Sequence, residues 1–197
     1  MIKVYASRGT RSQRVFWALE ELGAPYEVIA MTFPPRVHHP EFLAISPAGA
    51  LPAIQDGETT LIESLAICEY LNRKFGGDLV VASDAPGYLD YLQLMHFGES
   101  TPTPPLAWAR RFGPRLDSAL ADAREAFALR LGVVERTLAD GRDFLAAGRL
   151  TLADISVGYA LGLSALAGLH DLLPGPVLAY EDRLKARPAY QRAYAPT

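Results

Sequence analysis

The sequence has a single cysteine, Cys68, which excludes an internal disulfide and any metal site made only of cysteines. Its four histidines show no paired spacing, so we expect no metal centre. No run approaches the ~18 consecutive apolar residues of a membrane-spanning helix. The longest apolar stretch, residues 155–169, is interrupted by glycines and serines. The opening residues lack the order of a signal peptide, and we therefore expect a cytoplasmic protein with no membrane partner.

A strong charge of either sign is also missing. The 19 Lys and Arg residues and the 22 Asp and Glu residues give a net charge of −3. Because the basic residues are scattered, we expect no nucleic-acid partner. Hydrophobic residues make up 50% of the 197 residues and charged residues 21%, which is typical of a globular protein. The length allows one large domain or two compact ones.

The first part of the chain alternates between strand and helix patterns. Apolar residues alternate over residues 2–6 and recur over 26–30, which predicts two strands. Between them an apolar face with helical spacing predicts a helix, with Ser12 as its N-cap and Gly23 as its end. Since a helix separates the two strands, we expect them to be parallel.

A hairpin and a second helix follow. Asp56-Gly57 is a strong turn signal between apolar stretches at residues 51–55 and 59–62. A helix is predicted from about residue 64 to 75. The order of elements is therefore βαβ, an irregular connection, then ββα.

The remainder of the chain shows helical patterns throughout. Thr151 and Asp154 have the spacing of a capping box, in which each side chain satisfies a free N–H at a helix start. The segment Thr101–Pro105 is proline-rich, and we expect it to break the helical pattern between the first two helices. Helices are predicted over about 88–98, 115–139, from 151 onward, 177–186 and 188–194. These patterns predict an α/β domain at residues 1–77, a linker at 78–87 and an all-helical domain at 88–197.

Three short segments resemble motifs of the cytosolic glutathione transferase superfamily. Gly49–Ile54 (GALPAI) is similar to the segment of that family that contains a proline before a strand. Glu63–Ile67 (ESLAI) is similar to its Glu/Gln-Ser-x-Ala-Ile segment, and Thr151–Ser156 (TLADIS) to the Ser/Thr-x-Ala-Asp box of its helical domain. The three segments also follow one another in the order, and at about the separations, that the family shows. The resemblance implies a thioredoxin-like N-terminal domain with a mixed four-stranded sheet, plus an all-α C-terminal helical bundle.

The same resemblance implies glutathione as co-substrate, and five residues that bind it: Thr10, Leu51, Pro52, Glu63 and Ser64. A cis bond between Leu51 and Pro52, as in the family, would turn the Leu51 backbone outward to pair with the extended tripeptide. A cis X–Pro bond costs only ~0.5–1 kcal/mol. Ser64 and the free N–H groups of a helix start suit the γ-glutamyl carboxylate, and Glu63 suits the ammonium group.

The family places the thiol-activating hydroxyl in the turn after the first strand. Here the turn is Ser7–Gln13, and the resemblance selects Thr10 as the catalytic residue, with Ser12 second and Ser7 third. An ungapped count back from the helix selects Gly9 instead. Lowering a thiol pKa by about two units requires ~2.7 kcal/mol. A hydrogen bond to the thiolate supplies ~1.5–3 kcal/mol and a helix start ~0.3–1 kcal/mol, so no general base is needed.

The resulting hypothesis is a homodimeric glutathione S-transferase that activates the glutathione thiolate for attack on a small hydrophobic electrophile. The alternatives are a glutathione-dependent peroxidase or disulfide reductase, and a glutathione-binding protein without turnover. Cys68 is expected to pack in the core of the first domain, because it lies on the apolar face of the second helix.

Overall fold

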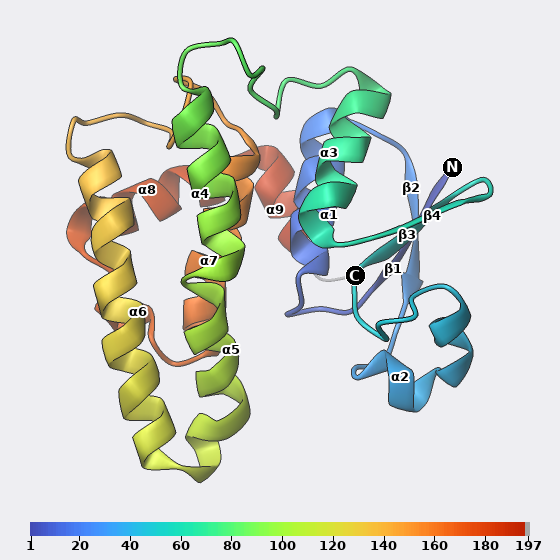
Figure 1. Cartoon of the computed structure of the whole chain (residues 1–197), viewed down its shortest axis with the longest axis horizontal. Helices are drawn as coiled ribbons and strands as arrows, with labels where there is room; N and C mark the ends of the chain where they lie inside the picture. The colour runs from blue at the N-terminus through green and yellow to red at the C-terminus, as the bar shows by residue number, and fades with distance from the viewer. Residues whose placement is uncertain (196–197) are drawn as a thin grey trace. The chain divides into compact units, whose positions relative to one another are not determined.

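The computed structural model describes residues 1–195, so the last two residues of the predicted 88–197 domain lie outside the described range. The chain divides into two compact units. The first unit contains residues 1–79 and the segment that begins at Pro188, and the second contains residues 80–187. The division after Leu79 falls inside the predicted linker. Figure 1 shows the sheet of the first unit and the long helices of the second.

The first unit has the predicted βαβ–ββα order and a mixed four-stranded sheet. The strands lie in the order β2-β1-β3-β4, with β1 parallel to β2 and antiparallel to β3, so the prediction of a thioredoxin-like domain is confirmed. The elements are β1 (Ile2–Ala6), α1 (Ser12–Leu22), β2 (Tyr26–Ala30), α2 (Pro35–His38), η1 (Pro40–Ala44), β3 (Ala53–Asp56), β4 (Thr59–Ile62), α3 (Ser64–Phe75) and α9 (Pro188–Tyr194).

Both faces of this sheet are covered. In β1, Ile2, Val4 and Ala6 are buried, and they alternate with residues that point to the opposite face. On that opposite face the Tyr5 ring lies 5.6 Å from the ring of Phe42 in η1, within a small apolar cluster. The helices α1 and α3 lie side by side along the strands (Figure 1). The strand β1, which leads into the turn before α1, is therefore packed on both of its faces.

The boundaries of α1 differ from the prediction at one end. Gly23 ends the helix in a left-handed conformation, as predicted. Ser12 is not the N-cap: it is the first helical residue, and Arg11 is the cap. The reason is that the Ser12 hydroxyl is engaged with Thr10, and the helix start is held by backbone bonds from Gln13 to Thr10 and from Arg14 to Arg11.

The last helix packs in the first unit, whereas the sequence grouped it with the helical domain at 88–197. The indole of Trp17, which is fully buried in α1, meets the ring of Tyr190 edge to face at 4.9 Å. Arg192 pairs with Glu20 at 2.6 Å on the same side of α1. An aromatic contact and an ion pair therefore attach α9 to the α/β unit, and helical periodicity alone does not reveal this.

The second unit consists of helices. They are α4 (Tyr88–Ser100), α5 (Thr103–Phe112), η2 (Gly113–Arg115), α6 (Asp117–Leu138), α7 (Leu152–Leu166), η3 (His170–Leu172) and α8 (Gly175–Lys185). α7 is buried along most of its length, and α4 packs closely against it. At the contact, a Cβ on Gly98 would lie 2.6 Å from the backbone carbonyl carbon of Ser156, so only glycine fits there. The predicted all-helical bundle is confirmed.

One helix of this unit was not predicted. Thr101–Pro105 was expected to interrupt the chain, yet α5 begins inside it at Thr103. Proline is tolerated in the first turn of a helix, where its missing N–H has no intrahelical partner to lose. The Thr103 hydroxyl donates to the Gly98 carbonyl at 2.7 Å, which fixes the bend between α4 and α5.

The predicted capping box of α7 is present and is more extensive than expected. Thr151 N–H donates to the Asp154 carboxylate at 2.8 Å, and the Thr151 hydroxyl accepts from the backbone of Ala153. Asp154 also accepts from the N–H of Leu145 and from the hydroxyl of Tyr180, each at 2.9 Å. Burial raises the pKa of the Asp154 carboxyl, and these donors oppose the rise.

Candidate functional site

Three segments that are distant in sequence emerge at one edge of the sheet. Tyr5, Ala53 and Ile62 lie in register across β1, β3 and β4. β1 and β4 end at or next to this row and β3 begins at it, so the chain beyond the row leaves the sheet on the same side. The three segments are the turn that follows β1, the Leu51–Pro52 dipeptide and the Glu63–Ser64 pair. They hold all the candidate site residues selected from the sequence.

The turn after β1 is organised by the hydroxyl of Thr10. This hydroxyl donates to the Ser7 carbonyl at 2.5 Å and lies 2.9 Å from the Ser12 hydroxyl. The backbone N–H of Ser12 donates to the same oxygen at 3.3 Å. Ser12 is fully buried, whereas Thr10 is partly exposed. A ligand at this edge can therefore meet Thr10, and Ser12 lies behind it.

The Leu51–Pro52 peptide bond is cis. The Leu51 side chain is buried in the cluster with Phe42, so the dipeptide is anchored to the sheet. Neither the N–H nor the C=O of Leu51 makes a hydrogen bond to another residue in the range 1–195. The backbone of Leu51 thus keeps a donor and an acceptor for a partner in extended conformation.

Glu63 and Ser64 form the start of α3. Glu63 is the N-cap, is exposed, and has φ 71° and ψ 110°, a conformation that residues other than glycine seldom adopt. Such backbone strain, about 1–3 kcal/mol, is concentrated at binding sites. Ser64 is the first helical residue and is 5% exposed. Ser64 is therefore the first residue of the helix and not its N-cap.

Sequence reasoning missed Arg14, which lies beneath this helix start. Arg14 is in α1 and has no exposed surface. Its Nη1 donates to Ser64 Oγ at 3.3 Å, and its carbonyl accepts from the thiol of Cys68 at 3.5 Å. Arginine stays protonated in proteins, so it places a positive charge below the N-terminus of α3. The only sequence signal was an arginine on the otherwise apolar face of a helix.

Cys68 is a core residue, as predicted. It is fully buried, and burial raises the pKa of its thiol to about 12. The thiolate, which is the nucleophilic form, is therefore not populated at neutral pH.

A pocket of about 310 Å³ adjoins the turn on the side of β2. We call it the β2 pocket. It is lined by residues of β1, the turn, α1, β2 and the segment around α9: Ala6, Ser7, Arg8, Gln13, Phe16, Tyr26, Val28, Ala30, Met31, Arg192, Ala193 and Ala195. Of the candidate site residues only Ser7 lines it.

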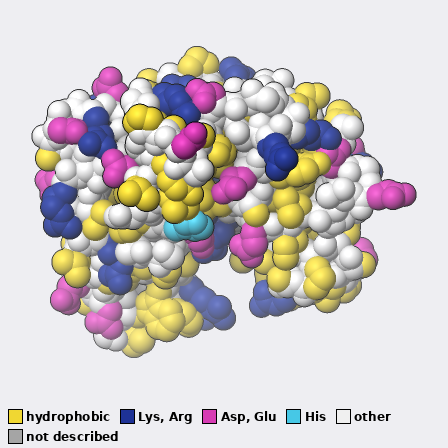
Figure 2. All heavy atoms as spheres, turned by 45° about the horizontal axis from the view of Figure 1, so that its top comes forward, with side chains coloured by type: hydrophobic (Ala, Val, Ile, Leu, Met, Phe, Trp, Pro, Cys, Tyr) yellow, Lys and Arg dark blue, Asp and Glu magenta, His cyan; other side chains and the backbone are white. Residues whose placement is uncertain are grey.

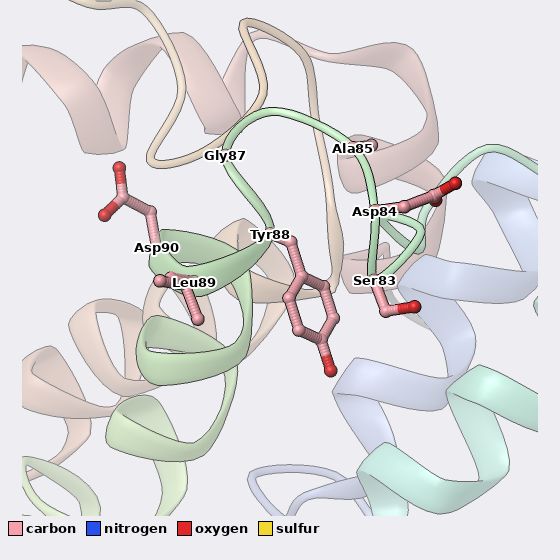
Figure 3. A pocket seen from close by; sticks show the side chains of 7 residues that line it. All are labelled: Ser83, Asp84, Ala85, Gly87, Tyr88, Leu89 and Asp90. Carbon is pink, nitrogen blue, oxygen red and sulfur yellow. The ribbon is translucent and has the colours of Figure 1, made fainter.

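The second unit has a shallow pocket of about 530 Å³ at the start of α4. Its walls come from one continuous loop and the first turn of that helix (Figure 3). The side chains of Asp84 and Asp90 point away from one another there, and Asp90 pairs with Arg142. None of the candidate site residues lines this pocket.

Three further features of the described residues bear on possible partners: the surface charge, the grouping of metal-binding side chains and the character of the helices. On the face drawn in Figure 2, basic and acidic side chains are interspersed. Among residues 1–195, no three His, Cys, Asp or Glu side chains are grouped in a way that could hold a metal ion. Within the same range, no helix combines the length and the apolar character that crossing a membrane requires.

Comparison with known proteins identifies the family. A family profile described as the glutathione S-transferase N-terminal domain matches residues 4–78. Glutathione S-transferase 3 of Schizosaccharomyces pombe is 36% identical over 110 residues, a match that spans 45% of that protein. Glutathione S-transferase 3 of Zea mays is 32% identical over 200 residues, which cover 92% of this chain and 87% of that protein. The chain belongs to the glutathione S-transferase superfamily.

A solved glutathione transferase has the same architecture. The glutathione transferase URE2P6 of Phanerochaete chrysosporium, in complex with oxidised glutathione, superposes with a TM-score of 0.84 at 30% identity. The superposition covers 98% of this chain and 94% of that protein. Both units thus belong to the glutathione transferase fold, and the segments that carried the sequence resemblance occupy its thioredoxin-like and helical domains.

Proposed function

We propose that this family member binds glutathione at the edge of its sheet and transfers it, as the thiolate, to a small hydrophobic electrophile. The observation that supports this most strongly is the row formed by Tyr5, Ala53 and Ile62. It brings a hydroxyl-bearing turn, an unpaired backbone and a helix N-terminus to one edge. These three features match the thiol, the peptide backbone and the γ-glutamyl end of glutathione.

The γ-glutamyl end is assigned to the start of α3. Ser64 accepts a hydrogen bond from Arg14, so its own hydroxyl hydrogen is available for the ligand carboxylate. The helix dipole and the buried guanidinium both favour a negative charge there. The exposed carboxylate of Glu63 is placed for the ligand ammonium group. The backbone of Leu51 pairs with the cysteinyl residue.

Thiol activation is assigned to Thr10. Its hydroxyl now donates to the Ser7 carbonyl, and a rotation about its Cα–Cβ bond redirects the hydrogen to a bound sulfur. Ser12 then donates to Thr10 and strengthens that bond. The thiol proton leaves to solvent. The thiolate attacks the electrophilic carbon, a C–S bond forms, and the electron pair departs with the leaving group.

Disulfide reduction is a second candidate, because URE2P6 was solved with oxidised glutathione. In that reaction the thiolate attacks a disulfide sulfur instead of carbon. The turn from Ser7 to Gln13 contains no cysteine, so no mixed disulfide with the protein forms there. This argues only against a route through a protein thiol; the glutathione thiolate itself can attack a disulfide, and the substrate panel below separates that reaction from transfer to carbon.

Retention on immobilised glutathione, followed by a panel of electrophiles, peroxides and disulfides, tests this proposal. We expect retention, and turnover with at least one aromatic electrophile. Turnover of peroxides or disulfides alone would favour the second candidate. Retention without turnover would indicate a binding protein. Homodimerisation and action in the cytoplasm, as the family resemblance implies, are part of the same proposal.

A further inference from the structure

We propose that one end of the helical unit binds the surface of an anionic lipid membrane through a patch of aromatic and basic side chains. The patch lies at the end of α5 and in the turn that leads to α6, and consists of Trp108, Arg111, Phe112, Arg115 and Leu116. We call it the α5 patch. Figure 1 shows the turn between α5 and α6 at one end of the helical unit. None of these residues belongs to the site proposed for glutathione.

The apolar part of the α5 patch is exposed. Trp108 is 53% exposed and Leu116 is 56% exposed. The ring of Phe112, which is half-buried, lies 4.5 Å from the ring of Trp108. The opposite side of α5 is buried through Leu106 and Ala109. A single exposed apolar residue needs no explanation, but several in one segment mark a contact surface.

The charge of the patch favours an anionic partner. From Thr101 to Leu116 the chain has three arginines and no acidic residue. Among residues 1–195, the side chains of Arg111 and Arg115 make no hydrogen bond or ion pair with another residue. The Arg111 guanidinium lies 5.2 Å from the centre of the Phe112 ring. Stacking uses the face of the guanidinium, so the N–H donors in its plane remain available for phosphate oxygens.

An anionic bilayer combines the two properties that the patch requires of its partner. Helices that lie in the headgroup region carry arginines beside tryptophan, phenylalanine and leucine: the arginines bind lipid phosphates, and the apolar side chains enter the acyl boundary. Neither the β2 pocket nor the pocket at the start of α4 includes a residue of the patch. The sequence-based expectation of no membrane partner rested on the lack of a spanning segment, which a contact with the membrane surface does not require.

Flotation of the full-length protein with lipid vesicles, together with tryptophan fluorescence, tests the proposal. At low ionic strength, binding to phosphatidylglycerol vesicles is expected to be at least about ten-fold tighter than binding to phosphatidylcholine vesicles, because only the former attract the arginines. Added salt is expected to reduce this difference by screening. Of the two tryptophans, Trp17 is fully buried, so a blue shift of the emission on binding reports Trp108.

Variants of the patch separate the charged from the apolar contribution. Arg111→Gln combined with Arg115→Gln is expected to weaken binding about 25-fold, since each arginine near an anionic surface contributes about five-fold. Trp108→Ser is expected to weaken binding by at least about ten-fold and to remove the blue shift. Arg73→Gln on α3 and Leu129→Ser on α6 change exposed side chains outside the patch, and these matched controls are expected to bind as the parent does. Circular dichroism verifies the fold of every variant.

Several outcomes would overturn the inference. They are the absence of vesicle binding, equal binding to both lipids, and equal losses in the patch variants and the controls. A second copy of the chain on the patch would also overturn it: Trp108→Ser would then halve the mass in light scattering, and the parent would not bind vesicles. So would a shift of the Trp108 emission on addition of an electrophile but not of vesicles. Failure of the protein to bind glutathione would leave the vesicle results intact and would refute only the proposed function.

Discussion

Arg14 has no exposed surface, yet its guanidinium contacts the hydroxyl of the serine that begins α3. Burying a charge is unfavourable unless interactions of the ion compensate for its desolvation, which costs several kcal/mol. In the proposed site the charge acts through Ser64: it orients the hydroxyl and raises the positive potential at the helix start. Thr10, by contrast, acts on the sulfur. In this proposal, Ser64 and Arg14 bind the γ-glutamyl end of glutathione, and Thr10 stabilises its thiolate.

A double-mutant cycle tests the link between Arg14 and Ser64. Ser64→Ala is expected to weaken glutathione binding by about 10- to 100-fold, since a charge-assisted hydrogen bond of ~1.5–3 kcal/mol is lost. Arg14→Gln is expected to weaken binding as well, but to add little once Ser64 is alanine. Titration calorimetry below the pKa of the thiol measures both effects. Thr10→Ala serves as control and is expected to lose less affinity than Ser64→Ala. Additive losses would show that Arg14 does not act through Ser64.

Cys68 provides a second test at this scale. Since burial raises its pKa to about 12, we expect no reaction with an aromatic disulfide reagent at pH 8 in the native protein. One thiol is expected to react after denaturation, because the chain has one cysteine. Rapid reaction in the native state would mean that α3 opens or that Cys68 is not buried.

Among the helices and strands, prediction worked best where a local signal fixes a boundary. Gly23 ends α1, and Thr151 with Asp154 begins α7, because capping depends on neighbouring residues only. The start of α5 was missed because a proline-rich segment is ambiguous: it can interrupt a helix or open one. The hydrogen bond from Thr103 to the Gly98 carbonyl supports the helix start, but it exists only in the folded chain and cannot be read from the sequence.

The Asp154 carboxylate is expected to be the most important polar group for the stability of the helical unit. Asp154→Ala removes the acceptor for donors on Thr151, Leu145 and Tyr180. Each buried donor without an acceptor costs ~1–3 kcal/mol, so the free energy of unfolding is expected to fall by at least about 3 kcal/mol. Urea denaturation measures the loss. Asp122→Ala, an exposed site on α6, is the matched control and is expected to change stability by less than about 0.5 kcal/mol. A similar small change for Asp154→Ala would refute this role.

At the scale of the whole molecule, the order of elements was readable from the sequence and much of the site was not. The turn after β1, the Leu51–Pro52 dipeptide and the Glu63–Ser64 pair were found separately in the sequence. Their meeting at one edge depends on strand register, which pairs Ala53 with both Tyr5 and Ile62. The contribution of α9 to the first unit and of Arg14 to the site rests on packing between segments distant in sequence. Local periodicity contains no such information.

The proposed homodimer is tested at the same scale. Light scattering at micromolar concentration is expected to give twice the chain mass of 21.4 kDa. The expectation comes from the family, whose members set the first domain of one chain against the helical domain of the other. A species of one chain mass at all concentrations would contradict it, and would leave the assignments within the first unit unchanged.

The most direct test of the account is the pKa of glutathione's thiol when it is bound. The thiolate absorbs in the ultraviolet, so a pH titration of the complex reports its ionisation. A free thiol has a pKa of ~8.5, and the parent complex is expected to titrate about two units lower. Thr10→Val keeps the shape of the side chain and removes the donor. The thiol pKa is then expected to rise by about one to two units, as ~1.5–3 kcal/mol is lost at ~1.36 kcal/mol per unit. An unchanged pKa in Thr10→Val, with a rise in Ser12→Ala or Ser7→Ala, would contradict the choice of hydroxyl. An unchanged pKa in all three variants would contradict activation by any side chain of this turn.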